Sequence, residues 1–379
     1  MFPPSALSGQ IISLVIPAYN EEDAILNTLR RALAVAENPA SFPKDIARVE
    51  IIVVSDGSRD RTAELARSLP GVTVVEYGKN RGYGKAIETG FAVASGDILA
   101  FMDADGTCDP AFLFDLWNEM QKTGADIVLG SRLHSNSRMP LIRRVGNTLY
   151  AILLSAISGR IVRDTASGMR ILKRSLLPLI LPLPSGLSFT PAMSARCLLD
   201  PRIHIGEIPM PYHERQGTSK LRVLRDGFMF LHVILVTALF YTPLRMFWTC
   251  ALALLLAAAL SPAAMRLPLV LSAELMAATG LLFHFFSKKI LPDWPTSRLQ
   301  KGLSRFFRIE TLVVGGFVLL SAGCFLLNPD SLIREATLYA SGLSFMLAAG
   351  RFILRQMDAW HATKLDKDTL LKDVVITRT

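Results

Sequence analysis

The chain has 379 residues, of which 51% are hydrophobic and only 19% are charged, against about 25% charged in an average soluble domain. This composition excludes a disordered chain, and four cysteines without CxxC spacing exclude a disulfide scaffold. The net charge of +9 is compatible with nucleic acid or an anionic membrane surface as a partner. Residues 1–226 carry only +3, and the remaining 153 residues carry +6, which argues against nucleic-acid binding.

The first half of the chain alternates short apolar runs with helical segments. Continuous apolar runs of about four to eight residues are typical of strands buried on both faces. We expect such strands at 11–17, 50–55, 72–77, 97–102 and 126–130, and helices at 21–36, 60–68, 82–94 and 110–122. Asp60 and Asp109 are expected N-caps, with Pro110 at the first helical position. The alternation predicts a doubly wound α/β fold, which binds ligands beyond the carboxyl ends of its strands.

Polar residues cluster after four of these strands, at 17–22, 55–58, 103–105 and 131–132. One such cluster is a turn, whereas four along one rim predict a site. Asp103 and Asp105 are separated by a single residue, so both carboxylates can face one hard cation such as Mg²⁺ or Mn²⁺. The alternative is a pair of solvated loop acids or a helix cap.

Two further features at this rim have open interpretations. Asp56 can accept a hydrogen bond from a base or ribose hydroxyl, or it can close an Asx-turn. The basic, glycine-containing loop 79–85 opens a helix and includes Lys85. It can bind phosphate at the helix N-terminus, or it can simply need glycines at positive φ.

Two sets of arginines and lysines supply positive charge near the same rim. The first set is Arg132, Arg143, Arg144, Arg163 and Arg170, and arginine is suited to bidentate phosphate binding. The second set lies at 215–225, immediately before an apolar segment. Basic residues beside a membrane either hold anionic lipid head groups or bind the phosphate of a lipid substrate, and both interpretations remain open.

The second half of the chain predicts a membrane domain. Residues 227–287 contain only three charged residues, and we expect spans at about 245–264, 267–287, 309–328 and 335–355. The segment 228–241 is too short to cross and predicts a helix in the membrane interface. The loop 288–308 holds six basic residues and one acid, so it belongs on the cytoplasmic side. The N-terminus lacks the features of a signal peptide.

These assignments divide the chain into a catalytic domain at 1–226, a juxtamembrane helix at 227–243, a four-helix membrane domain at 244–357 and a tail at 358–379. We therefore expect an integral protein of the cell inner or plasma membrane, with the catalytic domain and both termini in the cytoplasm. Such a placement also suits reduced cysteines.

Seven motifs follow one another in the first 226 residues. They are VIPAYNEE at 15–22, SDGSRD at 55–60, glycines 82 and 84 after Asn80, DADG at 103–106, GSR at 130–132, SGMR at 167–170 and RxGxSK at 215–220. In this order they resemble family 2 glycosyltransferases of the dolichol-phosphate mannose synthase and polyprenyl-phosphate glycosyltransferase type. The resemblance implies a GT-A fold, Rossmann-like with a mostly parallel sheet, and inverting transfer from a nucleotide-diphosphate sugar to a polyprenyl phosphate.

The resemblance also implies roles for individual residues. The residues expected to contact the donor are Pro17, Tyr19, Glu21, Asp56, Lys85 and Asp103. Asp103 and Asp105 are expected to bind a divalent cation. Asp105 and Arg132 are the expected catalytic residues. The residues expected to bind the acceptor phosphate are Arg143, Arg144, Arg215, Ser219 and Lys220.

The chain departs from the family pattern at several positions. Ser55 precedes Asp56 where the family often has a second acid, Thr107 stands where Gln is common, and Met169 replaces Phe. The acidic pair expected near 190 is missing, which argues against a conventional general base. A phosphate acceptor explains this absence, because a phosphomonoester with a second pKa near 6 is already largely a dianion at pH 7.

Two other functions compete with this one. A glycosyltransferase acting on a hydroxyl group of a lipid or growing glycan needs a base, which only His213, Glu214 or Asp164 can supply. A non-catalytic scaffold or transporter is the second alternative. The intact acid pair argues against a degenerate site, and spans with so few charges offer no polar pathway.

Overall fold

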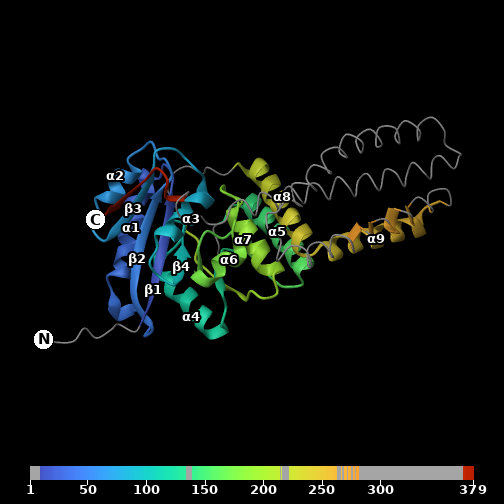
Figure 1. Cartoon of the computed structure of the whole chain (residues 1–379), viewed down its shortest axis with the longest axis horizontal. Helices are drawn as coiled ribbons and strands as arrows, with labels where there is room; N and C mark the ends of the chain where they lie inside the picture. Colours follow the sequence, from blue (N-terminus) through green and yellow to red (C-terminus); the bar gives the residue numbers. More distant parts are fainter. Residues whose placement is uncertain are drawn as a thin grey trace, which may run out of the picture. The chain divides into compact units, whose positions relative to one another are not determined.

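A single mixed β-sheet forms the centre of one compact unit, residues 1–237 and 365–379 (Figure 1). This unit is called the catalytic unit below because it contains the predicted catalytic domain. The computed structural model describes residues 9–133, 139–213, 215, 222–262 and 370–379, with scattered helical positions between 266 and 280. The sheet has the strand order β7-β5-β6-β4-β1-β2-β3-β8. The strands are β1 (Gln10–Ala18), β2 (Ile46–Ser55), β3 (Val72–Tyr77), β4 (Ile98–Phe101), β5 (Ile127–Ser131), β6 (Arg170–Lys173), β7 (Ile205–Pro209) and β8 (Val374–Arg378).

The α-helices of the described residues follow the predicted pattern in the first half of the chain. They are α1 (Glu22–Ala36), α2 (Thr62–Arg67), α3 (Tyr83–Val93), α4 (Leu113–Thr123), α5 (Leu141–Ser158), α6 (Leu177–Ile180), α7 (Phe189–Leu199), α8 (Val223–Tyr241) and α9 (Pro243–Leu260). All five predicted strands and the four predicted helices are present. Asp109 caps the short 3₁₀ turn before α4, where its carboxylate accepts from the Ala111 amide. Asp60 accepts a hydrogen bond from the Thr62 amide. If Asp60 were the N-cap, α2 would begin at Arg61, but the helix begins at Thr62.

The sheet is more mixed than the expected, mostly parallel arrangement. Strands β1, β2, β3 and β4 run parallel, but β6 pairs antiparallel with both β4 and β5, and β8 pairs antiparallel with β3. Strands β6, β7 and β8 were not predicted from the sequence. Each contains a charged residue, so none is a continuous apolar run like the equally short β4.

Helices cover both faces of the sheet, and alternation along each strand decides which core each side chain joins. Leu14 and Ile16 of β1 pack with α1 and α4 on one face, in a core that includes the fully buried Trp117. Val15, between them, packs on the opposite face with α3 and α7. This arrangement fixes the strands on both sides and leaves their carboxyl ends as the edge where loops can form a site.

The predicted juxtamembrane helix and the predicted first span are observed as two consecutive helices, α8 and α9. The predicted interfacial segment is observed as α8, which starts five residues earlier than 228 and ends at Tyr241, before the Thr242–Pro243 break. Among the described residues, only α9 is long and apolar enough to cross a membrane. The interfacial placement of α8 stays a prediction, as does the four-span count. The predicted spans at 309–328 and 335–355 lie outside the described residues, and so does most of 267–287.

The last ten residues return to the catalytic sheet. Strand β8 extends the sheet at β3, with Val374 opposite Tyr77 and Arg378 opposite Thr73 (Figure 1). The Thr379 hydroxyl donates to the carbonyl groups of Leu69 and Val72. The described end of the predicted tail is therefore an integral strand of the catalytic unit.

Candidate functional site

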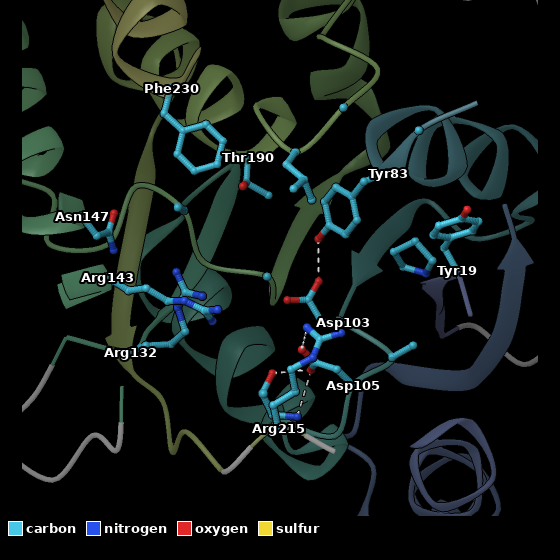
Figure 2. Close-up of a pocket in the computed structure, with 18 of the residues that line it drawn as sticks. Tyr19, Tyr83, Asp103, Asp105, Arg132, Arg143, Asn147, Thr190, Arg215 and Phe230 are labelled. Atoms are coloured by element: carbon cyan, nitrogen blue, oxygen red, sulfur yellow. Dashed lines mark hydrogen bonds and ion pairs between the residues drawn. The ribbon is translucent and has the colours of Figure 1, made fainter. Parts of the chain in front are cut away.

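A cavity of about 450 Å³ lies at the carboxyl ends of the parallel strands. Hydrogen bonds hold its first two loops together: the Asn20 amide donates to the Ser58 hydroxyl, and the Asn20 side-chain oxygen accepts from the Arg59 amide. The cavity collects most of the site residues that were predicted from the sequence (Figure 2). They are Pro17, Tyr19, Glu21, Asp56, Asp103, Asp105, Arg132, Arg143 and Arg215.

Two carboxylates at the end of β4 form the acidic part of the cavity. Asp103 Oδ1 accepts a 2.7 Å hydrogen bond from the Tyr83 hydroxyl, and Asp105 Oδ1 accepts from the amide and hydroxyl of Thr107. Burial, together with the neighbouring charge of Asp105, raises the pKa of Asp103 to about 7, although the Tyr83 hydrogen bond and two arginines oppose this shift. The acid pair therefore favours a positively charged partner.

Arg215 supplies that positive charge in this structure. Its Nη1 lies 2.7 Å from Asp105 Oδ2 and its Nη2 lies 2.8 Å from Glu21 Oε1, so one guanidinium bridges the ends of β1 and β4 (Figure 2). The Arg215 Nε is buried and has no hydrogen-bond partner among the described residues. A metal ion bound by Asp105 Oδ2 would have to displace this guanidinium.

Arg132 is held in place by a buried carboxylate. Asp164 is fully buried and accepts two side-chain hydrogen bonds from Arg132, at 2.8 and 2.9 Å, as well as one from the Arg132 amide. The Asn147 side chain donates to the same carboxylate and connects it to α5. The arginine charge keeps the pKa of Asp164 below its usual value despite the opposing effect of burial. Asp164 is therefore occupied as a positioning group and is unsuited to act as a base.

Asp56 fixes the loop that follows β3. Its two carboxylate oxygens accept from the amides of Arg81 and Gly82, at 2.6 and 2.9 Å. Gly57 has φ +67°, and a Cβ atom there would overlap the Asn80 backbone. Asp56 thus has a structural role, but through a loop 25 residues along the chain and not through the Asx-turn that was one of its two interpretations, and it also lines the cavity. Its contact with a nucleotide stays a prediction.

Lys85 does not lie among the residues that line the cavity. Its ammonium group pairs with Glu88 at 3.0 Å, and the amides of Gly84 and Lys85 donate to the Ser185 carbonyl. The second and third amides of α3 therefore already have an acceptor within the protein. The structure gives no support to a phosphate site at this helix end, and the donor contact of Lys85 stays a prediction.

Arg132, which follows β5, and Arg143 of α5 form the basic side of the cavity. Arg143 lines the cavity, and Figure 2 shows its guanidinium group on the same side as that of Arg132. Arg144 is absent from the lining, whereas Ser219 and Lys220 lie outside the described residues. The Arg132 guanidinium also lies 6.0 Å from the centre of the Tyr212 ring.

Several lining residues were not predicted as site residues, namely Tyr83, Asn147, Thr190 and Tyr212. Tyr83 stands between the two glycines of the recognised motif, and this position was the only signal that could have identified it. Asn147 and Tyr212 have no motif around them. Thr190 lies in the segment where the expected acids are missing.

Gly168 is required for the position of Asp103. A Cβ atom at Gly168 would overlap the Asp103 carboxylate. We expect Gly168→Ala to displace this carboxylate and to reduce glycosyl transfer by about 10²-fold, the usual effect of a misplacement of about 1 Å. Steady-state rates test this. Gly78→Ala is the matched control, because its Cβ atom enters open space. Equal rates for both variants would contradict the assignment.

Comparison with known proteins identifies the family. The glycosyl transferase family 2 profile matches residues 13–180. A dolichyl-phosphate hexose transferase of Haloferax volcanii is 34% identical over 57% of this chain and 89% of its own length. An undecaprenyl-phosphate 4-deoxy-4-formamido-L-arabinose transferase of Edwardsiella ictaluri is 31% identical over 62% of this chain and 70% of its own.

A solved structure has the same fold as the catalytic unit. Glucosyl-3-phosphoglycerate synthase from Mycobacterium tuberculosis, in complex with Mn²⁺, UDP-glucose and phosphoglyceric acid, aligns with a TM-score of 0.50 at 20% identity. The alignment covers 63% of this chain and 85% of the synthase. This likeness shows a GT-A-like fold. With the profile match and the relatives above, it establishes that the chain is a glycosyltransferase and belongs to glycosyl transferase family 2.

Proposed function

We propose that this enzyme transfers a sugar from a nucleotide-diphosphate sugar to a polyprenyl phosphate at a membrane surface, with inversion at the anomeric carbon. One observation carries the proposal. The same cavity joins the acids at the strand ends, where a donor would bind, to the basic and apolar residues of α5. The relatives named above act on dolichyl and undecaprenyl phosphates, which supports this acceptor class.

The donor side is suited to a divalent cation, Mg²⁺ or Mn²⁺. The residues that would hold the ion are Asp105 and Asp103, with further oxygen ligands coming from the diphosphate and water. When bound, the ion would neutralise charge on the departing diphosphate. The raised pKa of Asp103 supports this fit, because burial and the neighbouring charge of Asp105 disfavour its ionised form, which a divalent cation would stabilise. The related synthase structure contains Mn²⁺.

The acceptor side of the cavity offers positively charged side chains and no evident general base among the described residues. Of the three bases that a hydroxyl acceptor would require, Asp164 is bonded to Arg132, and His213 is absent from the cavity lining. Glu214 lies outside the described residues. A phosphate dianion can attack the anomeric carbon without first losing a proton. Arg132 and Arg143 would hold this phosphate, and so would Arg215 once it is released from Asp105.

The outer face of α5 supports a membrane-bound acceptor. It exposes an apolar stripe consisting of Leu141, Ile142, Val145, Leu149 and Ile152, whose exposed fractions range from 58% to 77%. Next to it, Phe228 of α8 is 72% exposed, and the Tyr150 hydroxyl of α5 donates to the Gly227 carbonyl. A contiguous apolar surface with arginines beside it fits the head-group region of a bilayer. A lipid phosphate could thus reach Arg143 from the membrane.

The pairing of β8 with β3 supports an even number of membrane crossings. Residues 1–237 and 365–379 belong to one compact unit, so both segments lie on one side of any membrane that the intervening chain spans. An odd number of spans would separate β8 from β3. This parity agrees with the predicted four spans and with an interfacial α8. The loop 288–308 is rich in basic residues, and such loops stay in the cytoplasm, so we assign that side to the cytoplasm.

The function is tested with the purified full-length protein. It is incubated with Mg²⁺ or Mn²⁺, radiolabelled nucleotide sugars and either polyprenyl phosphate or the matching polyprenol, and the lipid phase is then extracted. We expect label in the lipid only with the phosphate. Label only with the polyprenol would instead establish a hydroxyl acceptor, and no label with any sugar would favour a non-catalytic role.

Arg143 and Arg144 should differ in their effect on the acceptor. Of these two arginines, only Arg143 lines the cavity. We therefore expect Arg143→Ala to raise the acceptor KM by about tenfold, which corresponds to the loss of one charge-assisted hydrogen bond. Arg144→Ala should change it much less, and neither variant should alter the donor KM. Initial rates measured against polyprenyl phosphate concentration check this. A larger effect for Arg144 would contradict the geometry.

A further inference from the structure

The loop at residues 79–82, here called the donor loop, forms one wall of the cavity through Asn80 and Gly82. Asp56 holds it from the β2 side, through the amides of Arg81 and Gly82 and through the hydrogen bond from the Asn80 side chain to the Asp56 carbonyl. The loop therefore has an anchor on its inner side. Its outer side depends on a segment almost 300 residues away.

The Arg81 side chain points to that distant segment, and Arg81 is absent from the cavity lining. Its Nη2 donates to the Lys372 carbonyl at 2.6 Å, and its Nη1 donates to the Leu370 carbonyl at 3.3 Å. Its Cζ lies 4.5 Å from the centre of the Tyr77 ring, at the end of β3. The guanidinium group thus connects the donor loop, β3 and the C-terminal residues.

The C-terminal segment is itself fixed in register. Strand β8 pairs with β3 along its full length, and the Gly71 amide donates to the Thr379 carbonyl. Leu370, just before the strand, is only 2% exposed. Because this pairing determines where the carbonyls of Leu370 and Lys372 lie, it also determines where Arg81 can bind.

We infer that residues 370–379 are part of the donor-binding apparatus, with Arg81 as the positioning residue that transmits their effect to the donor loop. The inference rests on the proposed nucleotide-sugar donor. Without these residues, the donor loop keeps its hydrogen bonds to Asp56 but loses the anchor on its outer side. The hydrogen bonds of its amides therefore break transiently more often. Donor binding would then require the loop to be ordered first, and the apparent donor affinity falls.

Two variants test this inference, Arg81→Met in the full-length chain and a truncation after residue 369 that removes β8. Arg30→Met in the full-length chain is the control, because it removes an exposed arginine of α1 that does not line the cavity. We expect both test variants to raise the donor KM about tenfold, because hydrogen bonds from a charged group are lost. The acceptor KM and kcat should stay within about twofold, and the control should match the wild type.

Hydrogen–deuterium exchange of the ligand-free protein gives a second measurement that does not depend on the reaction. The amides of Arg81 and Gly82 should exchange faster in both test variants, while those of β1 and β2 stay unchanged. Unchanged exchange and an unchanged donor KM would overturn the inference. Faster exchange throughout the sheet, with a lower kcat and unaltered KM values, would also overturn it. If the wild type transfers no sugar, the proposed function fails, and the exchange measurement still decides the role of the tail.

Discussion

Asp105→Ala should reduce the rate of glycosyl transfer by at least about 10³-fold while the protein remains folded. The reason is that the substitution removes a charged group at the centre of the site. Asp105 connects Thr107 and Arg215 within the cavity, and it is the expected principal ligand of the cation. The substitution removes a small, buried side chain without touching either hydrophobic core. Rates with saturating donor and acceptor measure the effect, and thermal unfolding reports on the fold.

Binding of Mn²⁺ separates the two roles of Asp105. If Asp105 holds the ion, calorimetric Mn²⁺ binding in the presence of nucleoside diphosphate should be lost together with activity. Asp115→Ala is the matched control, because this acid is exposed on the first turn of α4. Near-normal transfer by Asp105→Ala would refute the metal assignment. A loss of activity with intact Mn²⁺ binding would instead point to the contact with Arg215.

Asp164→Asn should lower both stability and activity, because it leaves the partly buried charge of Arg132 without its counterion. Breaking a buried pair from one side costs about 3–5 kcal/mol of unfolding free energy. Asp164 accepts from Arg132, Asn147 and the Ala166 amide, so the loss extends from β5 to α5. The thermal unfolding midpoint should fall, and transfer should fall with it because Arg132 is no longer fixed.

The double variant Arg132→Gln with Asp164→Asn distinguishes the structural role from the catalytic one. It removes both charges and retains groups that can hydrogen-bond to each other, so most of the lost stability should return. Transfer should stay as low as in Asp164→Asn, because the phosphate has lost its arginine. Recovery of both stability and activity would show that Arg132 contributes only to the fold.

The acids of the site were predictable because their positions follow from local patterns. Asp56, Asp103 and Asp105 each follow a buried apolar strand within four residues, and the carboxyl ends of parallel strands must meet at one edge. The cavity lining confirms that these residues lie together. Arg132 was predictable for the same reason, since it follows β5. The partners of these side chains were not predictable. Asp164 lies in a segment with no predicted strand before it, and Tyr83 is the first residue of a helix and belongs to no cluster of polar residues at a strand end.

The sequence by itself determined the alternation of strands and helices, the strand-end acids and the separation of a balanced catalytic half from an apolar half. These properties are local, since hydrophobic periodicity and charge can be read over ten to twenty residues. Only the tertiary structure decided that Asp56 holds the donor loop, that Lys85 pairs with Glu88, and that the chain ends as strand β8 beside β3. Contacts between segments up to 300 residues apart depend on how the chain closes on itself, and no local pattern records that closure.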